Sequence, residues 1–222
     1  SPASSSTAKS SPNSPPSILR SSPVSQRKSS RFYKKTALQG DFCLSVILHC
    51  MKVVLYMGMS MNGYIAKTNG DSEWTSDEDL KGFFDHSKKA GNIVMGKNTF
   101  HAASEYGYFP FPEAVNVVVT HEKSENIWGD KVIFTEQSPK EVLAMLEEKG
   151  FMELFLAGGG LINSSFAKEK LIDEIYLDVE PLLLSKGIPV FAPTADFEFE
   201  LKLLEVKKLN EDTVQLHYQV LK

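Results

Sequence analysis

Three consecutive glycines, Gly158, Gly159 and Gly160, have the clearest potential for chemistry in this chain. They follow the short apolar run 153–157 and precede a segment whose composition suits a helix. Glycine adopts positive φ at little cost and lets the backbone approach another group closely. A glycine turn that opens a helix also presents free N–H groups and the positive end of the helix dipole to an anion. Two interpretations remain open from these residues: a cradle for a pyrophosphate, and a tight turn without a ligand.

The segments around this turn alternate between apolar strands and amphipathic helices. The continuous apolar run 53–59 is typical of a central strand buried on both faces. Helices are predicted from the cap residue Ser76 to Gly91, from Lys97, and from the capping box at Ser138 to Gly150. This alternation predicts an α/β fold with a mostly parallel central sheet, helices on both faces and a C-terminal antiparallel hairpin. The predicted strands are 53–59, 64–66, 92–96, 115–120, 131–134, 153–157, 175–179, 197–209 and 213–221.

Two further glycine segments, Gly58–Gly63 and Gly96–Thr99, fall where predicted strands end. Ligands of such sheets bind beyond the carboxyl ends of the strands, so we expect the three glycine motifs at one edge. A Rossmann dinucleotide motif is an alternative, because Gly158 and Gly160 fit its first glycine pair. Asn163 stands where that motif needs its third glycine, and the motif should open the first helix of the fold, so this alternative is disfavoured.

Charge divides the chain into two parts. Residues 1–50 carry seven basic residues and one acidic residue, whereas residues 51–222 carry 17 basic and 27 acidic residues, a formal charge of −10. Nucleic-acid binding needs clustered Lys and Arg, so we expect no nucleic-acid partner for this acidic body. Cys43 and Cys50 are the only cysteines, so the body has no cysteine nucleophile or Cys-based metal site. We predict no metal site, and no apolar run reaches the length of a membrane span.

Residues 1–50 begin with a Ser/Pro-rich segment that has nothing periodic to bury, so it is predicted to be disordered. Three interpretations of this leader remain open. It is an organelle transit peptide, a plain disordered tail, or non-native sequence upstream of Met51, which begins a well-patterned strand. A native start at Met51 predicts a cytoplasmic protein, and a native leader predicts a plastid or mitochondrial one. The predicted domain is 51–222.

Several short motifs of the body, in their order and spacing, resemble one superfamily. They are 60–66, 95–100, 115–120, 156–160, 171–174, Pro181 and 185–191. The body resembles the dihydrofolate reductases, and in particular the branch with the reductase half of the bifunctional riboflavin-biosynthesis deaminase/reductase. The resemblance covers Met51 to Lys222 and implies an NADPH-dependent reductase with the dihydrofolate reductase fold.

The resemblance also implies where the cofactor lies, across the ends of the strands. The residues expected around it are Gly58, Ile65, Ala66 and Gly70 at the nicotinamide, Gly96, Lys97, Asn98 and Thr99 at the phosphates, Thr120 and His121 at the adenosine 2′-phosphate, and Gly158, Gly159, Gly160, Leu161 and Ile162 at the pyrophosphate. The family commonly has Arg where this chain has Lys97. Lysine lacks the bidentate fork of arginine, so the preference for NADPH over NADH is an expectation that needs testing.

The same resemblance suggests residues for the substrate side. Ser60 and Trp74 are expected to bind substrate, and Asp79 is the best match to the acid with which dihydrofolate reductases bind their pterin. Asn62 stands where the family often has Asp, which makes it a candidate for substrate binding or proton delivery. For both candidate catalytic residues another interpretation stays open. Asp79 can simply complement the helix dipole, and Asn62 can be a turn residue that tolerates the left-handed conformation.

These features together predict a reductase that transfers a hydride to a pyrimidine- or pterin-like small molecule. The nearest named activity is that of 5-amino-6-(5-phosphoribosylamino)uracil reductase, and a dihydrofolate or pterin reductase is the alternative enzyme. A nucleotide-binding module without turnover is the alternative of another class. The family resemblance also implies a homodimer.

Overall fold

The computed structural model describes residues 51–222 except residues 123 and 195. The predictions made for the leader at 1–50 therefore lie outside the described residues. Among those described, no helix combines the length and the apolar character that crossing a membrane requires.

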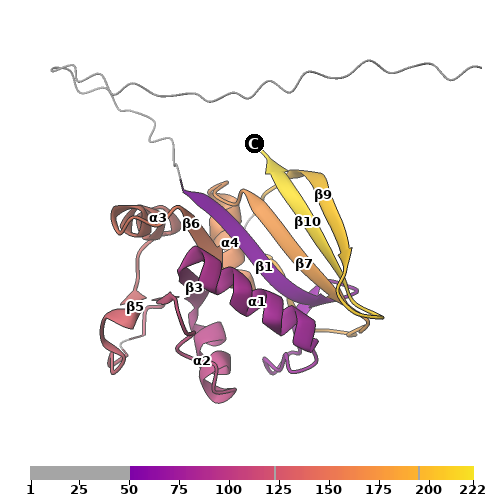
Figure 1. The fold of residues 1–222 in the computed structure, drawn as a ribbon, viewed down its shortest axis with the longest axis horizontal. Coiled ribbons are helices and arrows are strands. Elements are labelled where there is room, and N and C mark those ends of the chain that lie inside the picture. Colours follow the sequence, from indigo (N-terminus) through magenta and orange to yellow (C-terminus); the bar gives the residue numbers. More distant parts are fainter. Residues whose placement is uncertain (1–50, 123, 195) are drawn as a thin grey trace, which may run out of the picture. The chain divides into compact units, whose positions relative to one another are not determined.

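Eight strands form one sheet in the order β5-β4-β3-β6-β1-β7-β10-β9 (Figure 1). The pairs from β5 to β7 are parallel, β10 is antiparallel to β7, and β9 is antiparallel to β10. The carboxyl ends of β3, β6 and β1 are therefore neighbours, as the glycine motifs predicted. The strands are β1 Lys52–Ser60, β2 Tyr64–Ala66, β3 Asn92–Gly96, β4 Val115–Val119, β5 Val132–Thr135, β6 Glu153–Leu156, β7 Glu174–Glu180, β8 Ile188–Pro189, β9 Glu200–Lys208 and β10 Val214–Leu221.

The helices begin where their capping residues predicted. Ser76 accepts a bond from the backbone N–H of Asp79 at the start of α1, and Ser138 forms a complete capping box with Glu141 at the start of α3. Gly91 ends α1 in the left-handed conformation, with φ +70°. The helices are α1 Asp77–Ala90, α2 Lys97–Glu105, α3 Pro139–Glu148 and α4 Gly160–Lys168, with a short 3₁₀ turn at Gly129–Lys131.

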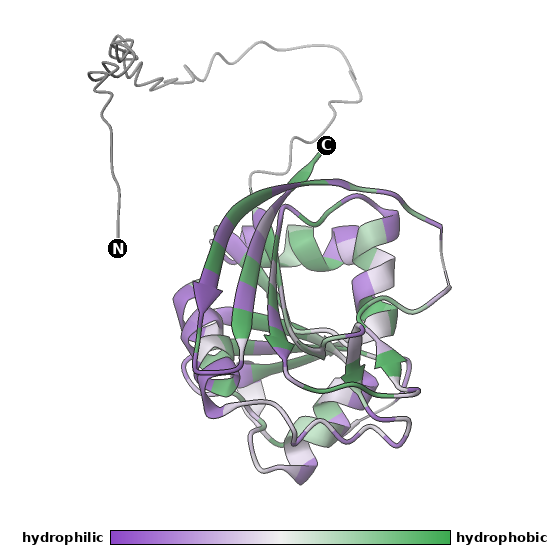
Figure 2. Ribbon diagram, turned by 90° about the vertical axis from the view of Figure 1, so that its right-hand side faces the viewer, coloured by the Kyte–Doolittle hydropathy of each residue, from purple (hydrophilic) through white to green (hydrophobic). Residues whose placement is uncertain are grey.

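Two hydrophobic clusters cover the two faces of the sheet. Leu55 of β1 packs on one side with α3 and α4, through residues such as Leu146 and Phe166. Tyr56, the next residue along β1, packs on the other side with α1 and α2. This alternation explains why β1 is apolar from Val53 to Met59, since its centre is buried on both faces. The hydropathy colouring in Figure 2 shows the contrasting alternation of hydrophobic and hydrophilic residues along the long strands near the C-terminus.

The C-terminal hairpin is confirmed, with one boundary corrected. The first strand was predicted from Phe197, but β9 begins at Glu200. Phe197 and Phe199 instead pack against the core, where Phe197 contacts Phe191 edge-on. Aromatic residues are common in strands and also in segments that pack on a core, so the sequence alone did not distinguish the two at Phe197 and Phe199. The two-stranded pairing of β2 with β8 was not predicted.

Candidate active site

The glycine turn joins β6 to α4 beside the start of α2. The backbone N–H of Gly96, at the end of β3, donates to the carbonyl of Gly158 at 2.8 Å, which ties the two turns together. Gly96 caps α2 and Gly159 caps α4, and neither helix has a side-chain cap. The other two helices both have serine caps. Two adjacent helix N-termini thus keep N–H groups for an external acceptor, which favours an anion at this edge.

The three glycines of the turn differ in what their missing side chains allow. A Cβ on Gly160 would lie 2.6 Å from the carbonyl oxygen of Pro189, and Gly158 has φ +82°, so both positions need glycine for packing or conformation. Gly159 has φ −75°, and a Cβ there would meet only Thr99 Oγ1 at 3.4 Å and Ile65 Cδ1 at 3.7 Å. A tight turn without a ligand therefore explains why Gly158 and Gly160 are glycines. It does not explain Gly159, where a ligand close to the backbone would.

Two residues expected near the cofactor phosphates, Lys97 and His121, each lie beside an acid. Lys97 Nζ lies 2.7 Å from Glu122 Oε1, and His121 Nδ1 lies 3.3 Å from Glu136 Oε2. Thr120 follows β4, and its hydroxyl accepts a bond from the backbone N–H of Glu122. The Glu122 carboxylate pairs with Lys97 and holds a negative charge where a phosphate is expected.

The other residues predicted around the cofactor differ in their packing and in their exposure to solvent. Ile162 packs beside Gly96, at 3.5 Å from where a Cβ would be. Leu161 is 62% exposed at the start of α4, and Asn98 is exposed in the first turn of α2. Ala66 is buried at the end of β2, whereas Gly70, with φ +92°, has no atom within 4 Å of where a Cβ would be.

Asp79 lies in the first turn of α1 and is buried, with 6% of its surface exposed. Gly58 of β1 makes room for it, because a Cβ at Gly58 would lie 2.6 Å from the Asp79 carboxylate. Below it, Asp178 accepts bonds from Tyr56 Oη at 2.5 Å and from Gln215 Nε2 at 2.8 Å. Asp79 Oδ1 has no hydrogen-bond partner. We call Asp79, Asp178 and Glu180 the buried acid cluster.

The proton content of this cluster follows from its contacts. Burial, the adjacent Asp178 and the charge of Glu180 raise the pKa of Asp79 to about 8. Burial also raises the pKa of Asp178, but the bonds from Tyr56 and Gln215 stabilise its anion. Because Asp178 accepts two hydrogen bonds and Asp79 Oδ1 accepts none, the contacts favour the anion of Asp178 and the protonated form of Asp79.

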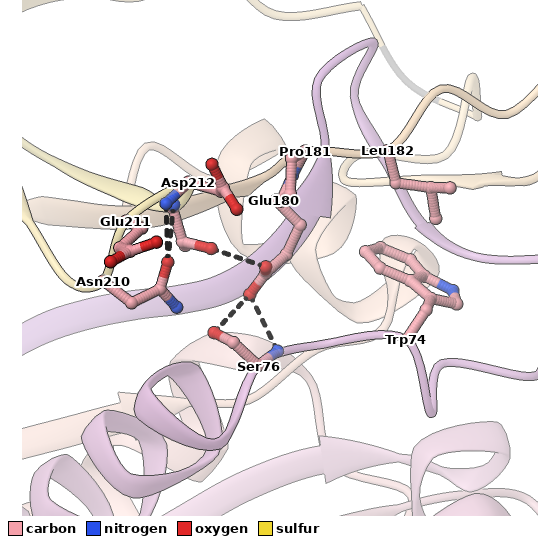
Figure 3. Close-up of a pocket in the computed structure, with 9 residues that line it drawn as sticks. Trp74, Ser76, Glu180, Pro181, Leu182, Asn210, Glu211 and Asp212 are labelled. Atoms are coloured by element: carbon pink, nitrogen blue, oxygen red, sulfur yellow. Dashed lines mark hydrogen bonds between the residues drawn. The ribbon is translucent and has the colours of Figure 1, made fainter.

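An open hollow with a volume of about 470 Å³ is lined by one member of the cluster, Glu180 (Figure 3). Its floor includes Glu180, which accepts bonds from Ser76 Oγ at 2.7 Å and Thr213 Oγ1 at 2.8 Å. Trp74 forms one wall, and its indole N–H donates to the carbonyl of Asp71. The lining residues are Trp74, Ser76, Glu180, Pro181, Leu182, Asn210, Glu211, Asp212 and Thr213.

Ser60 and Asn62 close a turn in the structure. The Ser60 hydroxyl donates to Asn62 Oδ1 and accepts from the backbone N–H of Tyr64. The Asn62 amide also bonds both backbone polar groups of Leu184. Asn62 lies in a turn, as one interpretation expected, but not in the left-handed conformation, because Glu113 and Lys170 are the non-glycine residues with positive φ among those described. Asn62 instead clamps two loops, and its catalytic role stays a prediction.

The comparison with known proteins decides the family. The RibD C-terminal domain family matches residues 51–215. The chain belongs to this family. It is 29% identical over 171 residues to the uncharacterised protein YwjB of Bacillus subtilis, covering 75% of this chain and 97% of YwjB.

Solved structures agree on the fold. A putative riboflavin biosynthesis protein from Shewanella sp. PV-4 superposes with a TM-score of 0.66 at 24% identity, covering 78% of this chain and all of the other. A Thermotoga maritima deaminase/5-amino-6-(5-phosphoribosylamino)uracil reductase gives 0.62 at 15% identity, covering 77% of this chain and 57% of its own. The dihydrofolate reductase-like fold is confirmed, and the chain is a RibD-like reductase domain, that is, an oxidoreductase domain.

The site contains residues that the sequence analysis missed. The sequence analysis singled out Asp79 but none of the residues grouped around it. These are Tyr56, Asp178, Glu180 and Gln215. One signal was present in the sequence, since Asp178 and Glu180 are acids at alternate positions of an otherwise apolar strand end. Among the residues that the structure describes, no group of three or more His, Cys, Asp or Glu side chains is placed to hold a metal ion.

Proposed function

We propose that the domain formed by residues 51–222 is an NADPH-dependent reductase that acts on a pyrimidine- or pterin-like small molecule. The observation that carries the proposal is the pair of helix N-termini capped by Gly96 and Gly159, without side-chain caps, at neighbouring strand ends. These fit a pyrophosphate, because free N–H groups and two helix dipoles converge there. When bound, NADPH supplies the hydride for a C=N or C=O carbon.

The residues of the chain then divide the remaining work. The amides of α2 and α4 hold the pyrophosphate, and the bare backbone of Gly159 lets it approach. Trp74 offers an aromatic surface on which a heterocyclic ring can stack. Protonated Asp79 holds a proton at Oδ1 or Oδ2 in a site closed to bulk water, which suits a proton donor near neutral pH.

The first candidate activity is that of a 5-amino-6-(5-phosphoribosylamino)uracil reductase, an activity that is part of the name of the Thermotoga maritima relative. A pterin or dihydrofolate is the second candidate, and the charge of the hollow favours an unphosphorylated ligand. Glu180, Glu211 and Asp212 line it, and none of its lining residues is Lys or Arg. A substrate phosphate would meet acids there, whereas ring N–H and amino groups would find acceptors.

Binding and turnover are tested separately. The full chain is titrated with NADPH and with NADH while the nicotinamide fluorescence is followed. Saturable binding with NADPH preferred is expected, and no binding of either dinucleotide would contradict the proposal. Oxidation of NADPH in the presence of the ribosylaminopyrimidine or of dihydrofolate then distinguishes a reductase from a nucleotide-binding module without turnover.

The acid beside Lys97 gives a first prediction. Replacing Glu122 by Gln should tighten NADPH binding by about fivefold, because Lys97 no longer shares its charge with a carboxylate. The gain stays modest, since the Lys97 side chain is 42% exposed and screened by solvent. The proposal places the 2′-phosphate near Lys97 and His121, so NADH affinity should not change, because NADH lacks this group. Both affinities are measured by the same titration at low and high salt.

Glu113→Gln is the matched control for that prediction. Glu113 pairs with Lys88 at 2.8 Å and is similarly exposed, so the net charge changes equally. An equal gain for NADPH in this control would attribute the effect to overall charge. An equal gain for NADH in Glu122→Gln would contradict the placement of the 2′-phosphate near Lys97.

A further inference from the structure

Asp178 lies at the centre of a group of buried polar side chains on the face of the sheet that α1 covers. In the strand register it lies directly beside Gly58 of β1 on one side and Gln215 of β10 on the other. Tyr56 precedes Gly58 by two residues and therefore points to the same face. Asp178 and Tyr56 are fully buried, and Gln215 is 8% exposed. Polar groups this deep in a core destabilise it unless hydrogen bonds satisfy them, so their presence calls for an explanation.

Two glycines leave the space that these polar side chains occupy. Gly58 has no side chain, and the Asp79 carboxylate of α1 fills the volume where one would stand. A Cβ on Gly82, in the middle of α1, would collide with the Tyr56 hydroxyl. Glycine inside a helix lowers stability relative to alanine, so its use here fits a need for that hydroxyl. The sequence thus accommodates Tyr56, Asp79 and Asp178 together.

The carboxyl groups of Asp79 and Asp178 are neighbours, and no cation balances them. Each lies close enough to hydrogen-bond to the other. Among the ion pairs in the described part of the chain, none involves either acid. His86 of α1 packs against the Tyr56 ring, but burial lowers the pKa of its imidazole, so it carries no charge near pH 7. Two adjacent buried carboxyl groups resist ionising together, so the pair holds one proton at neutral pH.

Hydrogen bonds decide which of the two acids is the anion. Tyr56 Oη and Gln215 Nε2 donate to the two oxygens of Asp178, and a carboxylate accepts such bonds better than a neutral acid does. Asp79 Oδ1 accepts no bond. Glu180, the other acid of β7, accepts hydrogen bonds of its own and adds its negative charge near Asp79. Both acids of β7 therefore oppose the loss of a proton from Asp79.

We propose that Asp178 is a positioning residue for the reaction: its buried anion, held by Tyr56 and Gln215, keeps on Asp79 the proton that the substrate receives. The inference rests on the proposed reductase function. Asp178 is fully buried, so it acts through Asp79 and not on the substrate itself. In the step, the O–H bond of Asp79 breaks and its proton goes to the nitrogen or oxygen of the reduced C=N or C=O group. A proton from solvent then restores the acid.

Asp178→Asn tests the proposal, because asparagine keeps the shape of the side chain and removes its charge. Its amide can donate to Tyr56 Oη, and the Tyr56 hydroxyl can then donate to the backbone carbonyl of Asp79, 3.3 Å away, so the variant should fold. The infrared band of the protonated carboxyl group is followed in the full chain without substrate as the pH rises. Wild type should lose this band near pH 8, and Asp178→Asn should lose it about one pH unit lower or more. Asp79→Asn should lack the band.

Turnover with NADPH gives a second measurement, with a substrate that wild type reduces. In Asp178→Asn the alkaline limb of the kcat profile should move to lower pH by the same amount as the band, because Asp79 is ionised at a lower pH. Below this limb, kcat should approach that of wild type, and KM for NADPH should not change. Asp85→Asn is the control, since it removes an acid of α1 whose side chain is 62% exposed. It should leave both the band and the limb in place.

Three results would count against these statements. A band and a limb that stay in place in Asp178→Asn would overturn the proposal, and so would a loss of turnover by the same factor at every pH. The latter would show that Asp178 serves the fold alone. A shifted band in a protein whose wild type reduces no substrate would contradict the proposed reductase function instead, while confirming that Asp178 holds the proton on Asp79.

Discussion

Gly159→Asp is expected to weaken NADPH binding by about a hundredfold or more while leaving the domain folded. The new carboxylate would stand at the N-terminus of α4, where the pyrophosphate is proposed to lie, and like charges at contact distance repel strongly. The backbone accepts the change, because Gly159 has φ −75° and a Cβ there makes only ordinary contacts with Thr99 and Ile65. Nicotinamide fluorescence titration measures the affinity, and circular dichroism confirms the fold.

Two further variants show whether the loss of NADPH affinity comes from the charge of the new side chain at position 159, from its bulk, or from adding an acid anywhere in the domain. Gly159→Ala adds only a methyl group, so its loss of affinity should be smaller than that of Gly159→Asp. Gly129→Asp places the same charge in a turn with φ +61°, which Asp tolerates, and with no atom within 4 Å of its Cβ position. It should bind NADPH like wild type. Unchanged affinity in a folded Gly159→Asp variant would remove the pyrophosphate from the glycine turn.

What the sequence could predict depended on residues close together in the chain. The caps at Ser76 and Ser138 were correct because a cap and the N–H it accepts from lie within three residues. The strand–glycine–helix order around Gly158–Gly160 was correct for the same reason. The placement of three strand ends at one edge followed from a general rule for parallel sheets, which needs only the order of elements.

The partners of these residues could not be predicted, because they come from distant parts of the chain. Tyr56 and Asp178 are 122 residues apart, and nothing in the spacing of either indicates their hydrogen bond. Gly58 was assigned to the cofactor by resemblance, yet the structure shows that it makes room for the Asp79 carboxylate. Likewise Lys97 was assigned to the cofactor phosphates by resemblance, and the structure pairs it with Glu122, 25 residues later.

Asp79→Asn is expected to stabilise the domain above neutral pH and to impair hydride transfer. The pKa of Asp79 is about 8 in the folded state, above its ordinary value of 3.8. Between these values the native state binds a proton that the unfolded state has released, so the free energy of unfolding falls as the pH rises. At about 1.4 kcal/mol for each unit, the penalty at pH 8 approaches about 6 kcal/mol as an upper limit.

An asparagine at this position removes the penalty because it carries no ionisable proton. Its amide N–H can donate to the adjacent Asp178, whose anion also accepts bonds from Tyr56 and Gln215. The groups that face position 79 are Thr75 just before α1, Tyr56 on β1, and Asp178 and Glu180 on β7, and none of them changes in the variant. The difference in melting temperature between the variant and wild type should therefore be small near pH 4 and should grow in favour of the variant up to about pH 8.

The same substitution separates a catalytic role for Asp79 from a purely structural one. Asp77→Asn is the control, since Asp77 is an exposed acid in the same helix turn and its loss changes the charge equally. If Asp79 supplies the proton, Asp79→Asn should bind NADPH normally but lose most of its turnover, because an amide does not donate a proton to substrate. A variant that is more stable at pH 8 and fully active would show that the buried proton serves the fold alone. A variant with an unchanged dependence of stability on pH would show that the proton resides elsewhere in the buried acid cluster.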